Sequence, residues 1–395
     1  MSQSSAKPAT SEYGTMEGTK SPRGGRASIA GIKPRIFQTN VGGDDRPYDI
    51  NDLITLRVFG QWHGTVFGSK NLWYETFIMA VFYWTILGIF IAVRWDGFSS
   101  FMGKESSVRA FIAMFSTLIG LLLSFYTALN LGRWWQMRQL VHVITESCKQ
   151  LVMYLASGVT KDGPLIDRIQ RYSRASLFLI FAANGYARHG GAKPMEAVKE
   201  RDFLTQDEVD KLIACCPDKV YIQSETLWVW LANAISRLND QGLTKGPPHY
   251  CMLMQCVEHG RAAVADVQAY LETPIPKGYV HLLCLMVKMH NFILTALMAL
   301  ACVMLTDKGG EFHGVGVFRT TFRAFFMPFL YNAILILNSQ VTDPFGFDAI
   351  DFPFEQYSID MKESADSFFE ATINVPDELS GRKRYEKVFI NPESP

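Results

Sequence analysis

The sequence predicts an all-α membrane protein with four transmembrane helices and a large cytosolic helical domain between the second and the third of them. Three observations lead to this fold class. Four apolar stretches have compositions suited to a bilayer, the segment between the second and the third follows a helical period, and no stretch sustains the alternation of a strand. With 395 residues, 28 of them Phe, the chain can hold a membrane part and a soluble part.

The first 47 residues are predicted to be a disordered tail, because they are rich in Ser, Gly, Thr, Pro and basic residues and contain no apolar run. The lack of such a run argues against a secretory signal peptide. An organelle transit peptide is the alternative, since Arg and Ser are frequent. Four acidic residues weaken this alternative: Glu12, Glu17, Asp44 and Asp45.

The first two apolar stretches, residues 72–93 and 111–131, are both predicted to cross the membrane. The first has a single charged residue, Glu75, near its start, and it is followed by Arg94 and Trp95, which are typical of the membrane interface. The second contains no charge. Both reach the roughly 20 apolar residues that a helix needs to cross a bilayer.

The third and fourth stretches, residues 278–305 and 324–337, are less regular. The third is long enough to cross, but it carries three side chains that are costly in lipid unless they face a bundle interior or water: His281, Lys288 and His290. The fourth is short, and length alone favours a buried helix of a soluble domain. If it does cross, two side chains before it can extend to the headgroups: Arg319 and Arg323.

If all four stretches cross, both termini lie on one side of the membrane, and the basic residues near the first pair predict which side. Five of them lie on the terminal sides and three in the intervening loop, which favours cytoplasmic termini. The five are Arg57, Lys70, Arg133, Arg138 and Lys149, and the three are Arg94, Lys104 and Arg109.

The central domain is expected to be a set of helices. Thr205 and Glu208 form a capping box, in which each side chain accepts from a free backbone N–H of the other, and Pro217 is expected to end the helix that follows. Residues 224–238 have helical periodicity and are followed by Gly242. Two further stretches have the same period: residues 168–185 and 249–270.

Catalysis is not supported by any motif, because the chain has no P-loop, G-x-G-x-x-G, H-E-x-x-H or G-x-S-x-G. The seven cysteines include no C-x-x-C, so they indicate neither a disulfide framework nor a zinc site. His281 and His290 are poorly spaced for a metal, and Cys215 and Cys216 are read as a buried helix end rather than nucleophiles. With 38 basic and 38 acidic residues, no nucleic-acid partner is indicated. Transport, and not an enzyme, is the favoured class.

Five motifs occur in order between about residue 48 and about residue 375. They are Gln61-Trp-His-Gly-Thr-Val-Phe67 with Tyr74-Glu75, Ser124-Phe-Tyr126 with Arg133-Trp134-Trp135, Trp228-Val-Trp-Leu-Ala-Asn233, Thr273-Pro-Ile-Pro276 with Tyr279, and Asp343-Pro-Phe-Gly346 with Asp348 and Asp351. Together they resemble the bestrophin family of anion channels. The resemblance implies a homopentamer in membrane lipid, with four membrane helices per subunit, one axial pore, and chloride, with bicarbonate as a further candidate, as the conducted ion.

The resemblance also implies which residues line the pore. Thr117, Leu121 and Phe125 match the narrow neck, and their i, i+4, i+8 spacing puts them on one stripe of a helix. Without the resemblance, a lipid-facing or packing stripe would be favoured. Pro248 matches a second, cytosolic aperture, although a pair of prolines that starts a helix explains it equally well.

The cofactor that the resemblance implies is calcium. Asp348 and Asp351 match the side-chain ligands of a calcium clasp, and main-chain carbonyls near Gln340, Asp343 and Tyr48 match its other contacts. Calcium takes six to eight oxygen ligands in flexible geometry. The alternative is that Asp343 caps a turn and the other carboxylates are solvated.

These observations favour a calcium-regulated anion channel, integral to the plasma membrane or to an organelle membrane. The alternatives are an organellar bicarbonate or chloride channel and a membrane-anchored helical scaffold that does not conduct. The predicted segments are a tail (1–47), an N-terminal cytosolic segment (48–71), the first membrane pair (72–131), the cytosolic domain (132–277), the second membrane pair (278–338), the calcium-clasp segment (339–375) and a C-terminal tail (376–395).

Overall fold

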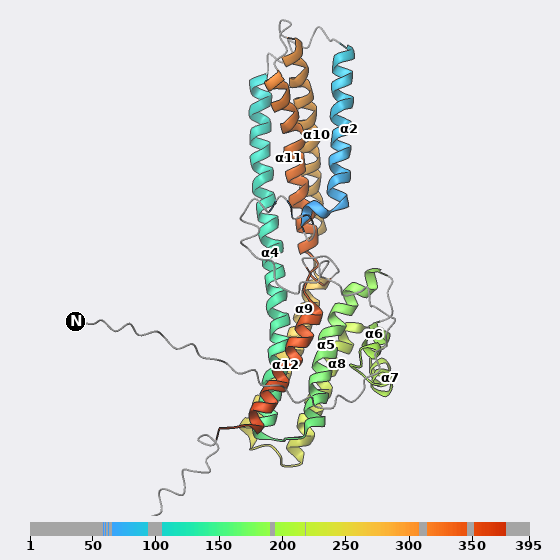
Figure 1. The fold of residues 1–395 in the computed structure, drawn as a ribbon, viewed down its shortest axis with the longest axis vertical. Coiled ribbons are helices and arrows are strands. Elements are labelled where there is room, and N and C mark those ends of the chain that lie inside the picture. Colours follow the sequence, from blue (N-terminus) through green and yellow to red (C-terminus); the bar gives the residue numbers. More distant parts are fainter. Residues whose placement is uncertain are drawn as a thin grey trace, which may run out of the picture. The chain divides into compact units, whose positions relative to one another are not determined.

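The computed structural model describes residues 58, 60, 62, 65–93, 105–189, 194–217, 219–307, 314–345 and 351–376. Within these ranges the structure is helical apart from short connections, and none of the described residues lies in a strand. The predicted all-α class is confirmed for them. The helices in chain order (Figure 1) are η2 (Val66–Gly68), α2 (Lys70–Val93), α4 (Glu105–Gly158), α5 (Gly163–His189), α6 (Pro194–Glu200), α7 (Gln206–Cys215), α8 (Val220–Asp240), α9 (Pro247–Glu272), α10 (Lys277–Asp307), α11 (Gly314–Val341) and α12 (Phe354–Ile373).

Four of these helices, α2, α4, α10 and α11, are long and apolar enough to cross a membrane. They pack against one another, with α10 in contact with the other three. The fourth corrects an expectation from length, because residues 324–337 are only the middle of α11, which has 28 residues. The polar residues that interrupt the hydropathy profile belong to the same helix, so α11 is long enough to cross a bilayer.

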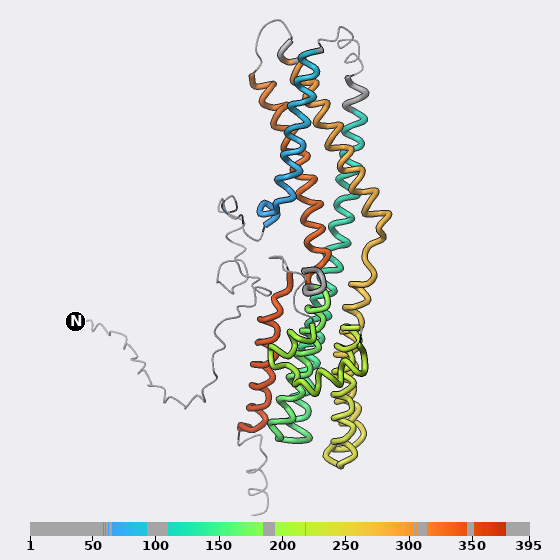
Figure 2. The backbone as a smooth tube through the Cα atoms, turned by 90° about the vertical axis from the view of Figure 1, so that its right-hand side faces the viewer, coloured from blue at the N-terminus to red at the C-terminus, as the bar shows by residue number. Residues whose placement is uncertain are grey.

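The second membrane helix does not end where its apolar stretch ends. Helix α4 has 54 residues and continues through position 132, where the cytosolic domain was expected to begin. Figures 1 and 2 show it beside α10 and α11 over its first half and beside α9 and α12 over its second half. One uninterrupted helix therefore belongs to both parts of the molecule.

The helical domain has one large apolar core, with the buried Trp228 of α8 at its centre. The indole nitrogen of Trp228 donates to the hydroxyl of Ser176 on α5 at 2.9 Å, so the ring is both buried and oriented. Phe345, Phe352 and Phe354, which follow the fourth membrane helix, are also buried in this core. Residues beyond α11 thus complete a domain that begins in α4.

Several local predictions in this domain are confirmed. Thr205 and Glu208 form the capping box of α7, with the Glu208 carboxylate accepting from the Thr205 amide at 2.8 Å. Gly242 follows α8 with a φ of 72°, which favours glycine. The expected buried helix end at the two cysteines is wrong for Cys215, which is exposed at the end of α7, while Cys216 is half-buried.

Candidate ion pathway and cation site

The three predicted neck residues lie on one exposed face of α4. Thr117 is exposed, and the side chains of Leu121 and Phe125 are 53% and 58% exposed. The opposite face of α4 is buried against α10 in an apolar cluster of Ile119, Leu123, Tyr126, Leu283 and Val287. The neck residues therefore take no part in the packing of their own bundle and are available to line a pathway or to contact another surface.

This face is uncharged over the whole membrane part of α4. No charged residue occurs between positions 110 and 132. The Thr117 hydroxyl donates to the carbonyl of Ala113 in the same helix at 2.9 Å, so its hydrogen is not presented to the outside. The edge of an aromatic ring such as Phe125 carries partial positive charge. The face thus offers aromatic edges and no charged group in the membrane part of α4.

Polar side chains on the buried side of α4 join it to α10 and α11. The Ser116 hydroxyl and His290 Nε2 form a hydrogen bond of 2.7 Å. Near the end of the membrane part, Asn130 donates to Asn338 at 2.8 Å, and Asn338 donates to Thr127 at 2.8 Å. All three hydrogen bonds connect residues that are more than 170 positions apart in the chain.

A charged pair lies between α2 and α10. Lys288 forms an ion pair with Glu75 and donates to the Asn332 side chain of α11 at 3.1 Å. Lys288 thus faces the bundle interior, which is one of the two environments in which a charged residue of this stretch is expected. His290 is 2% exposed whereas His281 is exposed, so the two histidines do not face one another as metal ligands.

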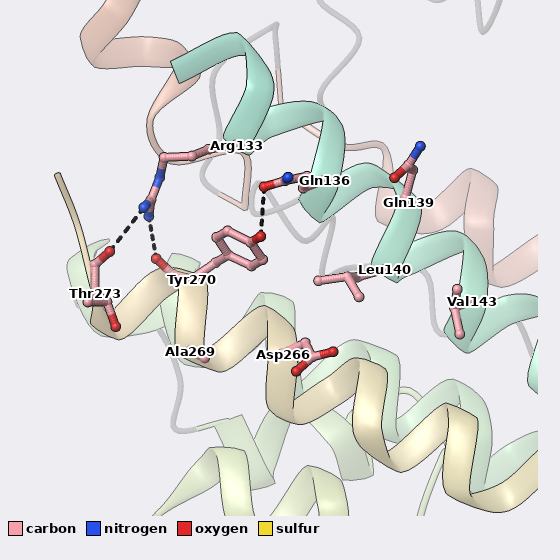
Figure 3. A pocket seen from close by; sticks show the side chains of 9 residues that line it. All are labelled: Arg133, Gln136, Gln139, Leu140, Val143, Asp266, Ala269, Tyr270 and Thr273. Carbon is pink, nitrogen blue, oxygen red and sulfur yellow. Dashed lines mark hydrogen bonds between the residues drawn. The ribbon is translucent and has the colours of Figure 1, made fainter. Parts of the chain in front are cut away.

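A groove of about 600 Å³ lies where α4 leaves the membrane part (Figure 3). Arg133 crosses it to donate to the backbone carbonyls of Tyr270 and Thr273, the latter at 3.0 Å. The Tyr270 hydroxyl donates to Gln136 at 2.7 Å. Arg133 thereby fixes the end of α9 to α4, immediately before the third membrane helix begins.

Pro248, the predicted cytosolic aperture residue, is the second residue of α9 and is exposed. Pro247 and Pro248 occupy the first turn, where a missing N–H is not a loss. The helix-starting role of the pair is confirmed. A pore-lining role for Pro248 stays a prediction.

Two of the five predicted calcium residues, Tyr48 and Asp348, lie outside the described residues. Gln340 and Asp343 are at the end of α11, and Asp351 is 6% exposed just before α12. The Phe352 amide donates to the carbonyl of Pro344 at 2.8 Å. This hydrogen bond joins the chain just after α11 to the chain just before α12, and Asp343 and Asp351 are the residues that precede its two partners.

The chemistry of these three residues fits a hard cation in part. The Gln340 side-chain oxygen is buried and has no hydrogen-bond partner among the described residues, and the buried carboxylate of Asp351 lies just before α12. Oxygen donors of this kind suit calcium. Within the described ranges, no group of three or more His, Cys, Asp or Glu side chains is arranged to hold a metal, so the described residues alone do not complete the site.

Two buried thiols of the helical domain, Cys148 and Cys256, have the properties of packing residues. Burial raises the pKa of the Cys148 thiol to about 11, and burial likewise raises the pKa of Cys256 to about 11. Since the thiolate is the nucleophilic form, these two side chains are unreactive at neutral pH.

Sequence reasoning missed Ser116, Asn130, Asn332 and Asn338 as functional candidates. Polar amides inside an apolar stretch mark interhelical contacts, so the two asparagines of α11 could have been identified from the sequence. The partner of each could not, because the hydrogen bonds join distant parts of the chain.

Four membrane-length helices tied together by buried polar side chains, with a helical domain built onto one of them, define a helical membrane protein. A model of the family described as "Bestrophin, RFP-TM, chloride channel" matches residues 49–364. The chain therefore belongs to the bestrophin family.

Solved structures agree with this assignment at the level of the fold. A mutant of a bacterial bestrophin homologue from Klebsiella pneumoniae is 16% identical, with a TM-score of 0.59, over 76% of this chain and 99% of that chain. A zinc-phased structure of such a homologue from the same organism is 15% identical, with a TM-score of 0.59, over 75% and 98%. A mutant described only as a membrane protein is 15% identical, with a TM-score of 0.60, over 76% and 99%. No curated protein matches the chain.

Proposed function

We propose that this chain forms a homopentameric anion channel whose axial neck is lined by Thr117, Leu121 and Phe125. The observation that carries the proposal is that these three side chains are exposed on α4 while the opposite face of the helix is buried in its own bundle. The description of the matching family as a chloride channel supports the choice of ion.

The neck acts by its apolar character. Five copies of an uncharged stripe around one axis form a constriction that can exclude water when it is narrow and admit a partly dehydrated ion when it widens. Large anions lose their hydration shells at lower free-energy cost than small ones. The Phe125 edges favour anions over cations, because they present partial positive charge.

Calcium is proposed as a regulatory ligand at the loop between α11 and α12. Gln340, Asp343 and Asp351, together with Asp348 and the carbonyl near Tyr48, would supply its oxygens. A bound calcium ion contributes charge neutralisation for the carboxylates. The chain's own contribution is to keep the loop ends together through the Phe352 to Pro344 hydrogen bond and to bury Phe345 and Phe352 beside them.

The proposal also includes membrane topology and location: four crossings, cytoplasmic termini, and either the plasma membrane or an organelle membrane. The excess of basic residues flanking the first pair supports this orientation. Localisation of a tagged chain distinguishes the two membranes.

The function is tested by recording from purified protein in planar bilayers. We expect reversal potentials that follow the chloride gradient and particles of five chains in native mass spectrometry. Phe125→Ala should raise single-channel conductance and weaken the discrimination between anions, because it removes the bulkiest side chain of the stripe. The matched control is Ile91→Ala, which removes an exposed apolar side chain from α2.

Silent bilayers with correctly assembled protein would support the non-conducting scaffold instead. If Phe125→Ala and Ile91→Ala changed the conductance equally, the stripe on α4 would not line the neck.

A further inference from the structure

The stripe on α4 can line a neck only if the helix keeps one rotation about its own axis. The apolar cluster behind it, Ile119 and Leu123 against Leu283 and Val287, keeps the helix in place. Apolar contacts are not directional, however, so they tolerate small rotations. The residues that fix the rotation must be those that make directional contacts.

Two sets of directional contacts bracket the stripe. Ser116, immediately before Thr117, bonds to His290 of α10 at 2.7 Å. Thr127, two positions after Phe125, accepts from Asn338 of α11 at 2.8 Å. We name these two contacts the α4 ties.

The ties have the geometry needed to set a rotation. At about 100° per residue, Ser116 and Thr127 are separated by three turns and point in directions that differ by only about 20°. The stripe is centred about 140° away from Ser116 on the same wheel. Both ties therefore hold one side of the helix at two heights, and the stripe lies on the other side.

The partners in the ties also have contacts outside α4. The His290 ring lies edge-on to Tyr331 of α11, with ring centroids 5.2 Å apart. Asn338 is 1% exposed, and its amide nitrogen also donates to the backbone carbonyl of Ile334 in its own helix at 2.8 Å. These contacts oppose a movement of either partner that would follow a turn of α4.

His290 is a polar side chain at a buried position, with 2% of its surface exposed. A buried polar group costs free energy unless it is hydrogen-bonded, and Nε2 of His290 is bonded to Ser116 of α4. The orientation of α4 that keeps this hydrogen bond is therefore favoured over orientations that break it.

We infer that Ser116, His290, Thr127 and Asn338 are positioning residues for anion conduction, which fix the rotation of α4 and thereby aim Thr117, Leu121 and Phe125 at the pore axis. The inference rests on the proposed function, since it assigns these residues to the same neck. None of the four touches the conducted ion.

The first test measures relative permeability, iodide against chloride, from reversal potentials, because this ratio does not depend on the amount of protein. Ser116→Ala and His290→Phe should each change the ratio about threefold, the change that corresponds to one average interhelical hydrogen bond. The double variant should change it no further, because both substitutions remove the same contact. His290→Gln should restore the wild-type ratio, because its amide nitrogen can replace Nε2.

The matched control is Thr85→Val in α2, which removes a hydroxyl that bonds only to the Val81 carbonyl of its own helix. Unchanged permeability in Ser116→Ala and His290→Phe, or additive effects in the double variant, would overturn the inference while leaving the channel function in place.

The second test does not require conduction. Leu121→Cys on the exposed face and Leu123→Cys on the buried face are alkylated with a water-soluble reagent, and each site is read separately by peptide mass spectrometry. We expect fast reaction at 121 and slow reaction at 123, with the difference reduced about threefold when His290→Phe is added. A rate ratio that His290→Phe leaves unchanged would show that the ties do not set the rotation, whether or not the protein conducts.

Discussion

Glu208 shows how one side chain in this protein serves two structural purposes. It completes the capping box of α7 by accepting from the Thr205 amide, and it accepts from the Tyr172 hydroxyl of α5 at 2.6 Å. Burial alone would raise the pKa of Glu208, but the hydrogen bonds from Tyr172 and Thr205 and the charge of Arg171 outweigh it, so the pKa is lowered. The ionised carboxylate is therefore the form that holds α7 on α5.

Glu208→Gln is expected to lower the free energy of unfolding of the helical domain by about 1 kcal/mol at pH 7. Glutamine can keep the capping box, but it loses the charge that pairs with Arg171 and strengthens the hydrogen bond from Tyr172. Because the pKa is lower in the folded chain, this stabilisation is present above the unfolded carboxyl pKa of about 4.3 and is lost as the pH falls through the folded value. The difference between variant and wild type should then disappear.

Thermal unfolding in detergent at pH 7 and in the acid range measures this effect. Glu363→Gln, which changes an exposed carboxylate of α12, is the control and should have no effect at either pH. A deficit of Glu208→Gln that persists in acid would contradict the electrostatic part of the argument.

At the scale of residues, the sequence predicts what is local. The capping box can be predicted because Thr205 and Glu208 are three positions apart. The hydrogen bond from Tyr172 to Glu208 cannot be predicted, because its partners are 36 positions apart. In the same way, His290 and Lys288 are visible as costly residues in an apolar stretch. Their partners Ser116 and Glu75 come from other helices and follow only from the packing.

At the scale of the helices, α8 and α9 pack closely at a glycine of α9, Gly260, which faces Trp228 of α8. A Cβ atom at Gly260 would fall on the six-membered ring of Trp228. Trp228 is fully buried and cannot move away without disturbing the core. Glycine is required here because of space, since Gly260 is inside a regular helix.

Gly260→Ala is therefore expected to destabilise the domain by about 1–3 kcal/mol, the usual effect of overpacking, although alanine has the higher helix propensity. Gly132→Ala in α4 is the control, because nothing lies within 4 Å of its Cβ position. We expect the control to be neutral or slightly stabilising in thermal unfolding. Equal stability of the two variants would show that the α8–α9 contact relaxes easily.

The extents of the helices are where the sequence predicts least. The existence of four apolar helices is clear from composition, but α4 and α11 both continue beyond their apolar stretches. Hydropathy falls at Arg133 and at Arg319 without any helix-stopping signal in the backbone. Polar residues such as Asn130 and Asn338 remain helical because they bond to each other inside the bundle.

At the scale of the whole molecule, the chain after α11 is linked by contacts to α4, which carries the proposed neck. The loop leads directly into α12, and α12 packs against the second half of α4. Phe352, at the end of the loop, contacts Trp134 of α4 with ring centroids 5.2 Å apart. The proposed cation site and the proposed neck are thus connected through a single helix, α4.

Replacing Asp348 and Asp351 together by alanine is expected to abolish the calcium dependence of the anion current while leaving the iodide-to-chloride permeability ratio unchanged. The reason is that calcium can shift the open population only by its differential affinity for the open state, whereas the neck determines selectivity. Recording across calcium concentrations measures both quantities. Asp360→Asn, in the exposed part of α12, is the control.

Currents that do not respond to calcium in the wild type, or that respond equally in both proteins, would remove calcium regulation from this account. The carboxylates of the proposed site are predicted from the sequence because they lie close together along the chain, and their role as ligands stays a prediction. The hydrogen bond from Phe352 to Pro344 and the burial of Asp351 depend on how the chain folds back after α11, and they could not be predicted from the sequence.

The unbroken course of α4 has a mechanical consequence. At 1.5 Å per residue its 54 residues extend over about 80 Å, and the backbone hydrogen bonds inside it leave no flexible joint. A torque applied to the half that contacts α12 is therefore passed along the helix axis, and the hydrogen bonds of Ser116 and Thr127 to α10 and α11 are the contacts that resist it in the membrane part.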